Sequence, residues 1–495
     1  MPRLLKRLFS AQALLPKSGA QGEVPSTKEA YMNLLRIALP SVCEMVLISL
    51  MGSIDTMMVG GIGTEAIAAV GLVGQPRMLM LCMFFAMNPG ITAVVARRKG
   101  QGDREDANRT LRTSLLIIFL MSLVMTVVGQ LVARPLMRLA GAKADTIDDA
   151  EIYFRIVNAL SMAMCAAQRG IGNTRITLYV NVTSNVVNVF LNWLLINGIW
   201  IFPRWEVKGA AIATAIGLCV GSVLACISLV RRHEGDMGFL RLSVKDDWRF
   251  SLPAARAVVK VGGNSMLEQI ALRIGFFLYA RLVADLGTQA YASHVVCMQF
   301  LNLSFTFADG IGVASTSLVG QMLGRERPDL SHLYGKIAQR IAVVGAVLLA
   351  SVIVIFRYPL VGLFTDDPTV ARLSANVMLI VALFQPLQML SVITSGALRG
   401  AGDTKFVARV MLICVAIIRP VLAFSAIRLI TQFFTPVYAE AAFAGAAATL
   451  TYWLAYEAPE WALLGAWAAS LVDMALRMGL VMKRFNGGKW HSIKV

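Results

Sequence analysis

Four asparagines interrupt an apolar segment at intervals of four, three and four residues: Asn181, Asn185, Asn188 and Asn192. On an α-helix these intervals place the four amides within about 60° of one another, so they form one polar stripe. An amide without a partner in an apolar medium costs roughly 2–7 kcal/mol, so the stripe must face polar groups, water or an ion. Two chemistries fit this pattern: hydrogen bonding between helices, or ligation of a small cation by amide oxygens.

Acidic residues in other apolar segments form a second group of candidates. Glu44 and Asp55 lie in the first segment, on one helix face and about 16 Å apart along the axis. A charged side chain in hydrocarbon is costly, so each predicts an ion site, a substrate contact or a paired base. Glu268 repeats Glu44 in the second half of the chain, and two such carboxylates facing a shared cavity would attract a cationic substrate. The alternative is a structural ion pair, for Glu268 with Arg273 or Arg419.

The chain that positions these residues has 495 residues, of which 57% are apolar and 15% charged, with a mean hydropathy of +0.67. In soluble proteins about a quarter of all residues are charged, so this composition excludes an ordinary soluble protein. Apolar runs of about 20 residues, which can cross a hydrocarbon core of ~30 Å, recur about twelve times. We therefore predict an all-α integral membrane protein with twelve transmembrane helices.

The net charge of +17 is distributed unevenly along the chain. With the amino terminus in the cytoplasm, most of the 46 Lys and Arg residues fall in cytoplasmic tails and loops, which is the positive-inside pattern. We predict that both termini are cytoplasmic and that the basic loops contact anionic lipid rather than nucleic acid.

Motifs for enzymatic chemistry are missing from the sequence. It has four His residues, no His–Cys metal spacing and no phosphate-binding Gly-rich loop with a Lys. We predict neither an enzyme nor a bound metal or cofactor, and expect a proton or sodium gradient as the driving force.

The two halves of the chain repeat each other. The segments around Glu44 and Glu268 match over some sixty positions at a spacing of 224, and RGIGNTR from Arg169 matches RGAGDTK from Arg399 at a spacing of 230. Six helices return the chain to the side where it started, so both repeats share one orientation. We predict two six-helix lobes, related by a pseudo-twofold axis along the membrane normal, with a cavity between them.

This repeat sets the expected domain boundaries. A cytoplasmic tail (1–30) precedes the first lobe (31–232), and a charged cytoplasmic linker (233–253) leads to the second lobe (254–495). The second lobe carries an insertion near 431–461 that either lies at the membrane interface or caps the outside.

The repeat also allows the two lobes to be compared position by position. The counterparts of the asparagine stripe are Met411, Val415, Ile418 and Leu422, and the counterpart of Asp55 is Tyr279. All four stripe counterparts are apolar. The comparison therefore predicts that the first lobe has a polar interior that the second lobe lacks.

Several ordered motifs in both halves resemble the multidrug and toxic compound extrusion (MATE) transporters. In the first half they are GSIDTMMVGGIGTEAIAAVG, RGIGNTR, and NVVNVFLNWLLINGIWIFP followed by VKGAAIAT; in the second half they are LGTQAYASHVV, LRGAGDTK and LLGAWAA. The resemblance implies a twelve-helix exporter that uses an inward proton or sodium gradient to expel small organic, often cationic, compounds by alternating access. It also matches Asp55 to the aspartate that the family uses for ion coupling.

The stripe and the resemblance together place ion coupling in the first lobe. We expect Asp55 to be the titrating or cation-binding group. Asn188 and Asn192, with Asn185 and Thr214, are expected to act as oxygen ligands or hydrogen-bond partners.

Two departures from the family bear on the coupling ion. Asn192 stands where one branch of the family has a second aspartate, and Gln388 stands where another branch has an acid. Both departures favour a proton over sodium, although the choice stays open. Glu44 and Glu268 are expected to face the substrate cavity, and Asp309 is interpreted as a counter-charge for an intramembrane arginine, Arg273.

Taken together, these features predict a monomeric antiporter for small organic, cationic compounds in a bacterial cytoplasmic membrane. The alternative is a flippase for a lipid-linked intermediate with a related two-lobe architecture. That function would favour a basic central cavity, for which Arg77, Arg273 and Arg419 are the candidates.

Overall fold

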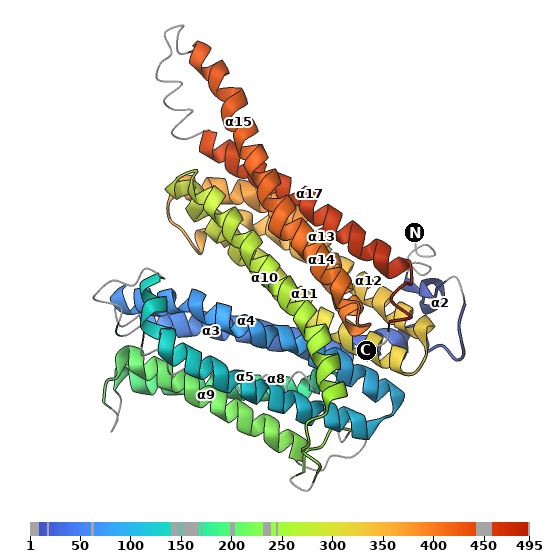
Figure 1. The fold of residues 1–495 in the computed structure, drawn as a ribbon. Coiled ribbons are helices and arrows are strands. Elements are labelled where there is room, and N and C mark those ends of the chain that lie inside the picture. The colour runs from blue at the N-terminus through green and yellow to red at the C-terminus, as the bar shows by residue number, and fades with distance from the viewer. Residues whose placement is uncertain are drawn as a thin grey trace.

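Long helices joined by short connections make up the computed structural model of the chain (Figure 1). No strand occurs in the described residues, which are 9–16, 19–60, 64–139, 148, 151, 168–170, 172–198, 203–230, 239–243, 246–441 and 458–493. Within these ranges only the backbone is described at 51–57, 59–60, 64–81, 136–137, 139, 207 and 433–441.

The helices follow the hydropathy of the sequence closely. Of the helices in the described ranges, nine are long and apolar enough to cross a membrane. One of the twelve apolar segments expected from the sequence, near residues 147–168, lies largely outside the described residues. In chain order the helices are α2 (Ala11–Leu14), α3 (Thr27–Gly60), α4 (Thr64–Gln101), α5 (Arg104–Leu139), α8 (Thr174–Asn197), α9 (Glu206–Val230), α10 (Leu252–Ala284), α11 (Thr288–Gly324), α12 (Pro328–Gly362), α13 (Pro368–Gly400), α14 (Thr404–Met411), the π-helix η2 (Leu412–Ile418), α15 (Arg419–Ala441) and α17 (Ala458–Asn486).

Local sequence signals explain where individual helices begin and end. Asp367 caps α13, because its carboxylate accepts hydrogen bonds from the backbone N–H groups of Thr369 (2.8 Å) and Val370 (3.2 Å), and Pro368 supplies the first helical residue. Gly198 ends α8 in the left-handed conformation (φ +66°). These caps hold the long helices at defined lengths.

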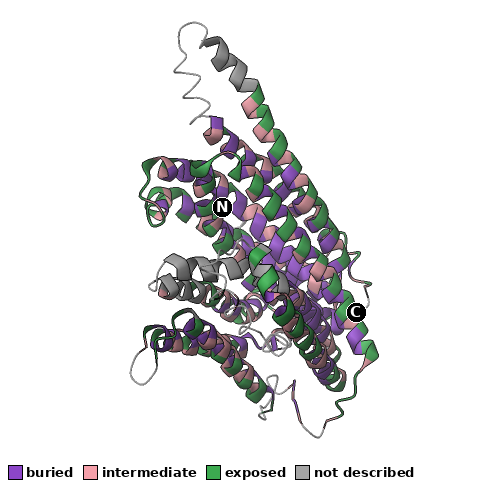
Figure 2. Ribbon diagram, turned by 60° about the vertical axis from the view of Figure 1, so that its left-hand side comes forward, coloured by how far each residue is buried: buried purple, intermediate pink, exposed green. Residues whose placement is uncertain are grey.

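The helices form two groups, which correspond to the two halves of the sequence. In the first lobe α8 packs along both α3 and α9; in the second, α13 packs against α11, α12 and α17. Figure 2 shows that many of the helices bury one face and expose the other. The exposed faces are rich in large apolar residues, as expected for helices that face lipid.

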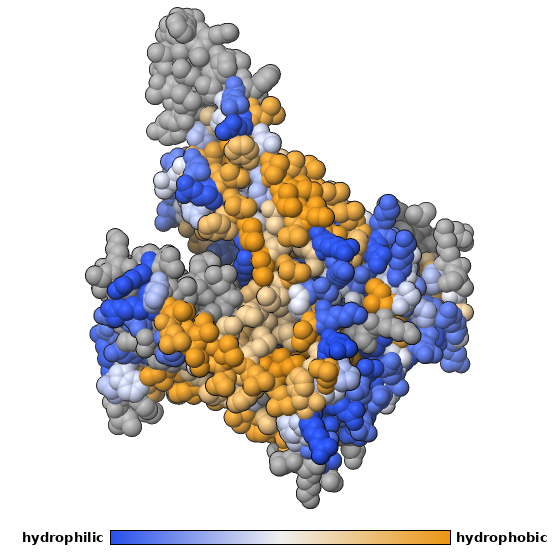
Figure 3. Space-filling model, in the orientation of Figure 1, coloured by the Kyte–Doolittle hydropathy of each residue, from blue (hydrophilic) through white to orange (hydrophobic). Residues whose placement is uncertain are grey.

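Contact between the lobes is concentrated at one end of the molecule. There α4 packs on α10 and α11, and α3 packs on α11. The N and C termini lie at the same end, and the lobes diverge toward the other end (Figure 1). Figure 3 shows an indentation between the lobes on the side away from the termini, and a broad apolar band that crosses the middle of this face.

Glycines bring the two lobes into backbone contact along this seam. A Cβ on Gly324 of α11 would collide with the carbonyl of Arg97 and the Cα of Gly100 on α4, so neither helix can carry a side chain there. Further along, a Cβ on Gly90 would lie 2.7 Å from the carbonyl oxygen of Val258 on α10. The close approach therefore depends on the absence of side chains.

The segment before α3 extends this contact onto the second lobe. Ala11 and Leu14 of α2 are buried in one cluster with apolar residues of α12. The backbone N–H of Gln21 donates to the carboxylate of Asp329 (3.0 Å) at the start of α12. The same carboxylate accepts from Arg327, and this hydrogen bond raises the pKa of the Arg327 guanidinium above its ordinary value.

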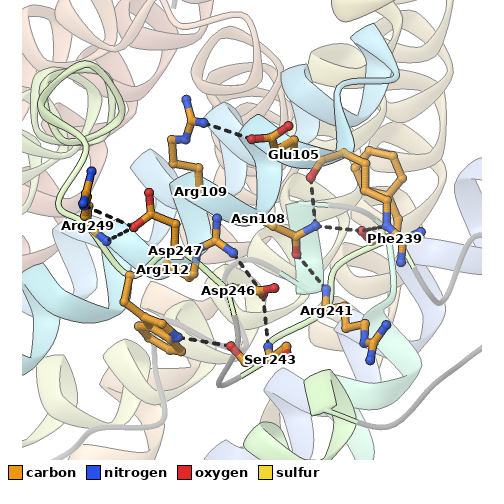
Figure 4. A network of polar contacts seen from close by, with 12 residues as sticks. Glu105, Asn108, Arg109, Arg112, Phe239, Arg241, Ser243, Asp246, Asp247 and Arg249 are labelled. Carbon is orange, nitrogen blue, oxygen red and sulfur yellow. Dashed lines mark hydrogen bonds and ion pairs between the residues drawn. The ribbon is translucent and has the colours of Figure 1, made fainter.

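Part of the linker between the lobes is bound to the start of α5 (Figure 4). Asn108 donates to the carbonyl of Phe239 (3.4 Å) and accepts from the backbone N–H of Arg241 (2.7 Å). Arg112 forms an ion pair with Asp246 (2.9 Å). The charged linker thus packs against the first lobe through specific polar contacts.

The predicted insertion begins as a continuation of a membrane helix. α15 extends through residue 441, and α17 begins at residue 458. Residues 442–457 lie outside the described part of the chain.

The glycine seam predicts the effect of a bulky substitution. Gly324→Val should disfavour this arrangement by roughly 1–3 kcal/mol, because overpacking pushes α4 and α11 apart. With spin labels at the exposed helix ends Asn197 and Asp285, in a background without native cysteines, we expect a shorter distance between the diverging ends by pulsed electron paramagnetic resonance. Gly263→Val is the matched control, since a Cβ there meets no heavy atom within 4 Å. Equal distance distributions for the two variants would contradict the role of the seam.

Candidate functional site

Glu44 of α3 lies at the centre of a buried polar network in the first lobe. Its side chain has no exposed surface. Arg169 donates to Oε1 (2.5 Å), Asn181 donates to the same oxygen (2.7 Å), and Thr177 donates to Oε2 (2.7 Å). An ion pair with two further hydrogen bonds compensates the cost of burying the carboxylate. Glu44 therefore ties α3 to α8 and to the RGIGN segment.

The asparagine stripe of α8 continues this network along the helix. Asn185 donates to the backbone carbonyl of Asn181 (2.8 Å), Asn188 donates to the hydroxyl of Thr214 on α9 (3.2 Å), and Asn192 donates to the amide oxygen of Asn188 (3.4 Å). Asn188 and Asn192 are buried, with 5% and 1% of their surface exposed. The prediction that these amides find polar partners inside the protein is confirmed for these described contacts.

Small residues let α8 and α9 approach closely enough for these hydrogen bonds. A Cβ on Gly217 of α9 would lie 2.9 Å from the Cβ of Asn188, and the hydroxyl of Ser184 donates to the Gly217 carbonyl (2.5 Å). Such glycine contacts are typical of packing between membrane helices. Helix packing thus positions Asn188 against Thr214.

Asp55, the predicted coupling group, belongs to α3, about three turns beyond Glu44. Its side chain lies outside the described residues, as does that of Arg77. The residues predicted to act with Asp55, namely Asn188, Asn192 and Thr214, are brought together by the contacts given above.

The second lobe repeats the buried Glu–Arg pair of the first. Arg399 donates to Oε1 of Glu268 (3.1 Å), and the Glu268 side chain is buried. One of the two expectations for Glu268 was a structural ion pair. Its predicted partners were Arg273 or Arg419, and that part of the prediction is wrong. The sequence carried the signal for the right pair, because Glu44 matches Glu268 and Arg169 matches Arg399 in the internal repeat.

The prediction that the second lobe lacks a polar interior is wrong. Arg419 of α15 forms a buried ion pair with Asp473 of α17 (2.8 Å). One turn further along, the guanidinium of Arg477 is fully buried and donates to two sulfur atoms, Sδ of Met411 (3.5 Å) and Sδ of Met474 (3.3 Å). This cluster has two positive charges and one negative charge.

The prediction failed because the comparison covered only the stripe positions: Arg419 lies between two of their counterparts, Ile418 and Leu422, and Asp473 and Arg477 lie on another helix. The stripe counterparts Met411 and Val415 are apolar and buried, as the repeat indicates. Comparing only the counterparts of the asparagines cannot detect polar groups that lie at other positions. The signal lay on the last apolar segment, where four residues recur within about 120° on one helix face: Trp467, Ser470, Asp473 and Arg477, all buried.

A π-helical segment, Leu412–Ile418, directly precedes Arg419. Gly275 of α10 lies against its backbone so closely that a Cβ would collide with the carbonyl of Val415. π-Helical turns are frequent at functional sites, where they change the direction of the side chains that follow. Here the segment sets the position from which Arg419 reaches Asp473.

Two buried amides of α13 add to the polar interior of the second lobe. Gln388 donates to the backbone carbonyl of Leu301 (3.4 Å), and the Gln385 side-chain oxygen accepts from Ser304 of α11. Among the described residues, no group of three His, Cys, Asp or Glu side chains could hold a metal ion.

Comparison with known proteins identifies relatives along the whole chain. The MatE family model matches residues 40–194 and 265–425, one segment in each lobe. A probable multidrug resistance protein NorM of Thermotoga maritima is 27% identical over 485 residues, which cover 96% of this chain and 95% of that protein. The uncharacterized transporter YisQ of Bacillus subtilis is 26% identical over 386 residues, covering 76% and 82%.

Solved structures show the same fold. A MOP superfamily transporter from Pyrococcus furiosus superimposes with a TM-score of 0.79 at 19% identity, over 93% of this chain and 97% of that one. A multidrug resistance MATE family transporter in an outward-facing conformation gives a TM-score of 0.75 at 19% identity, over 92% and 97%. The predicted twelve-helix, two-lobe membrane fold is confirmed.

The buried Glu–Arg pair predicts a large effect of neutralising one partner. Glu44→Gln leaves the Arg169 guanidinium without its counter-charge and should destabilise the protein by roughly 3–5 kcal/mol. Thermal unfolding in detergent micelles measures this loss. The control is Asp285→Asn, which breaks the exposed Arg281–Asp285 pair and should cost about 0–1 kcal/mol. Similar losses in both variants would show that Glu44 and Arg169 do not stabilise the lobe.

The second-lobe cluster has one more arginine than acid, so removing the acid and removing an arginine should have opposite effects on stability. Asp473→Asn leaves two buried guanidiniums without an acid and should lower the unfolding temperature strongly. Arg477→Met removes the excess charge and fits a site lined by Met411 and Met474, so it should be neutral or stabilising. A larger loss for Arg477→Met than for Asp473→Asn would contradict this assignment.

Proposed function

This chain belongs to the MatE family of membrane transporters, and we propose that it exports small organic cations in exchange for protons or sodium ions. Members of this family are transporters rather than enzymes, and the chain is a multi-pass membrane protein. The names of its relatives, several of them multidrug resistance proteins, support efflux of organic compounds.

The arrangement of the lobes supports alternating access. The lobes meet where both termini lie and diverge at the opposite end (Figure 1). With the termini in the cytoplasm, as the basic loops predict, this is an outward-open state. Rocking of the lobes about the space between them would then expose a site to the cytoplasm.

We assign ion coupling to the first lobe, and the buried amide stripe is the observation that carries this assignment. Asn188 and Asn192, with Asn185 and Thr214, place several amide and hydroxyl oxygens inside a membrane-embedded bundle. Such groups can solvate a small cation or accept and relay a proton. Asp55 on the neighbouring α3 is the proposed titrating or cation-binding group.

Glu44 and Glu268, which were expected to face the substrate cavity, form ion pairs in this conformation. Each of the two acids is bound to an arginine. We propose that a substrate cation contacts them only when these pairs open during the transport cycle.

The competing flippase function requires a basic central cavity. The positions of the candidate arginines give little support for such a cavity. Of its three candidate arginines, Arg419 is buried within the second lobe and paired with Asp473. The side chain of Arg77 is outside the described residues, and Arg273 alone is described as exposed. The exporter function is therefore favoured.

The same proposal includes the membrane, the orientation and the oligomeric state of the protein. We place it as a monomer in the cytoplasmic membrane of a bacterium, with both termini inside, surrounded by lipid and without a resident cofactor. The two sequence relatives named above, from Thermotoga maritima and Bacillus subtilis, are bacterial.

Asp55→Asn should abolish gradient-driven transport, because an amide cannot exchange a proton or balance a bound cation. The assay uses proteoliposomes with an imposed proton or sodium gradient and follows ethidium movement; the gradient that drives it identifies the ion. Asn192→Leu should also weaken coupling by roughly tenfold or more. Asn197→Leu is its control, because Asn197 lies exposed at the end of the same helix. Wild-type transport by Asp55→Asn would refute the proposed coupling role.

A further inference from the structure

A second polar stripe runs along α11, a helix that crosses the membrane. Gln299, Asn302, Thr306 and Asp309 recur at intervals of three, four and three residues, which keeps them within about 80° over about 15 Å. Gln299, Asn302 and Asp309 are exposed and Thr306 is half-buried, whereas Ala308 beside them is buried. Of these four residues only Gln299 is repeated in the first half of the chain, where Gln75 stands at the spacing of 224.

The position of Asp309 places the end of this stripe where the lobes meet. The next residue, Gly310, lies against α3 so closely that a Cβ would be 2.6 Å from the Cα of Val42. From Asp309 toward Gln299, α11 runs away from the seam, to the end where the lobes diverge. Four polar side chains, one of them charged, are excluded from hydrocarbon by their desolvation cost. The stripe therefore lines the space between the lobes.

The charge around Asp309 is not balanced. Glu268 and Arg399 lie within electrostatic range of Asp309, but they are paired with each other. Arg399, rather than the expected Arg273, is thus the nearby guanidinium. No side chain among the described residues donates a hydrogen bond to the Asp309 carboxylate or forms an ion pair with it. Two carboxylates and one guanidinium sum to one net negative charge, and the carboxylate without an ion-pair partner among the described residues is that of Asp309.

We propose that this stripe is the substrate-binding surface of the second lobe, and that Asp309 forms an ion pair with the cationic group of an organic substrate. The rest of the stripe offers neutral hydrogen-bonding groups to the remaining length of the substrate, from Gln299, Asn302 and Thr306. A carboxylate in a partly desolvated cleft binds a cation more strongly than one in bulk water. This inference rests on the proposed export of organic cations and assigns the residue that selects for charge.

Binding to the purified full-length protein tests the inference without a transport cycle. Ethidium, a permanent cation, and Nile red, an uncharged aromatic dye, are titrated against the wild type, Asp309→Asn and Asp309→Glu. We expect Asp309→Asn to weaken ethidium binding roughly tenfold or more, to leave Nile red binding unchanged, and Asp309→Glu to retain most ethidium affinity. Asp285→Asn is the charge-matched control, because Asp285 lies exposed at the end of α10, paired with Arg281.

The outcomes separate this inference from the function on which it rests. Equal ethidium affinity for the wild type and Asp309→Asn would overturn the assignment of Asp309. A parallel loss of ethidium and Nile red binding would also overturn it, because charge recognition would then not be the cause. Failure of the wild type to move ethidium under either gradient in proteoliposomes, with ethidium binding still dependent on Asp309, would instead overturn the proposed export function.

Discussion

A charge buried in a membrane protein needs a counter-charge, and this constraint organises both lobes. Glu44 with Arg169, and Glu268 with Arg399, place one ion pair at equivalent positions of the two repeats. Each pair joins the first helix of its lobe to a segment more than a hundred residues later in the chain. Because an unpaired partner would be strongly destabilising, these pairs fix how the helices of each lobe pack around its interior.

Beyond this shared pair the lobes differ in how they carry polar groups inside hydrocarbon. The first lobe uses neutral amides in series, with Asn188 and Asn192 bonded to hydroxyl and amide groups. The second lobe uses charge, with Asp473 beside two arginines. Neutral amides can change partners at little electrostatic cost, whereas a buried ion cluster resists rearrangement. This contrast supports a first lobe that responds to an ion and a second lobe that stays more rigid.

Hydropathy and the internal repeat were sufficient to predict the fold, because both depend on local composition and on spacing along the chain. The asparagine stripe was predicted for the same reason, since its residues lie on one helix. Partner identity could not be predicted in this way. The repeat matches Glu268 to Glu44 and Arg399 to Arg169, but the spacing alone does not show that the acid and the arginine of each half are partners. Such pairs depend on how separate helices pack.

The contact of Gly100 with Gly324 at the closed end has a kinetic consequence. Where a pore is shut by one bulky side chain, a rotamer change on the nanosecond timescale can open it. Here two backbones lie together over several turns, so water can enter only after whole helices separate. Opening at this end should therefore be a concerted, all-or-none event on the microsecond to millisecond timescale of domain motion, and leakage through partly opened intermediates should be rare.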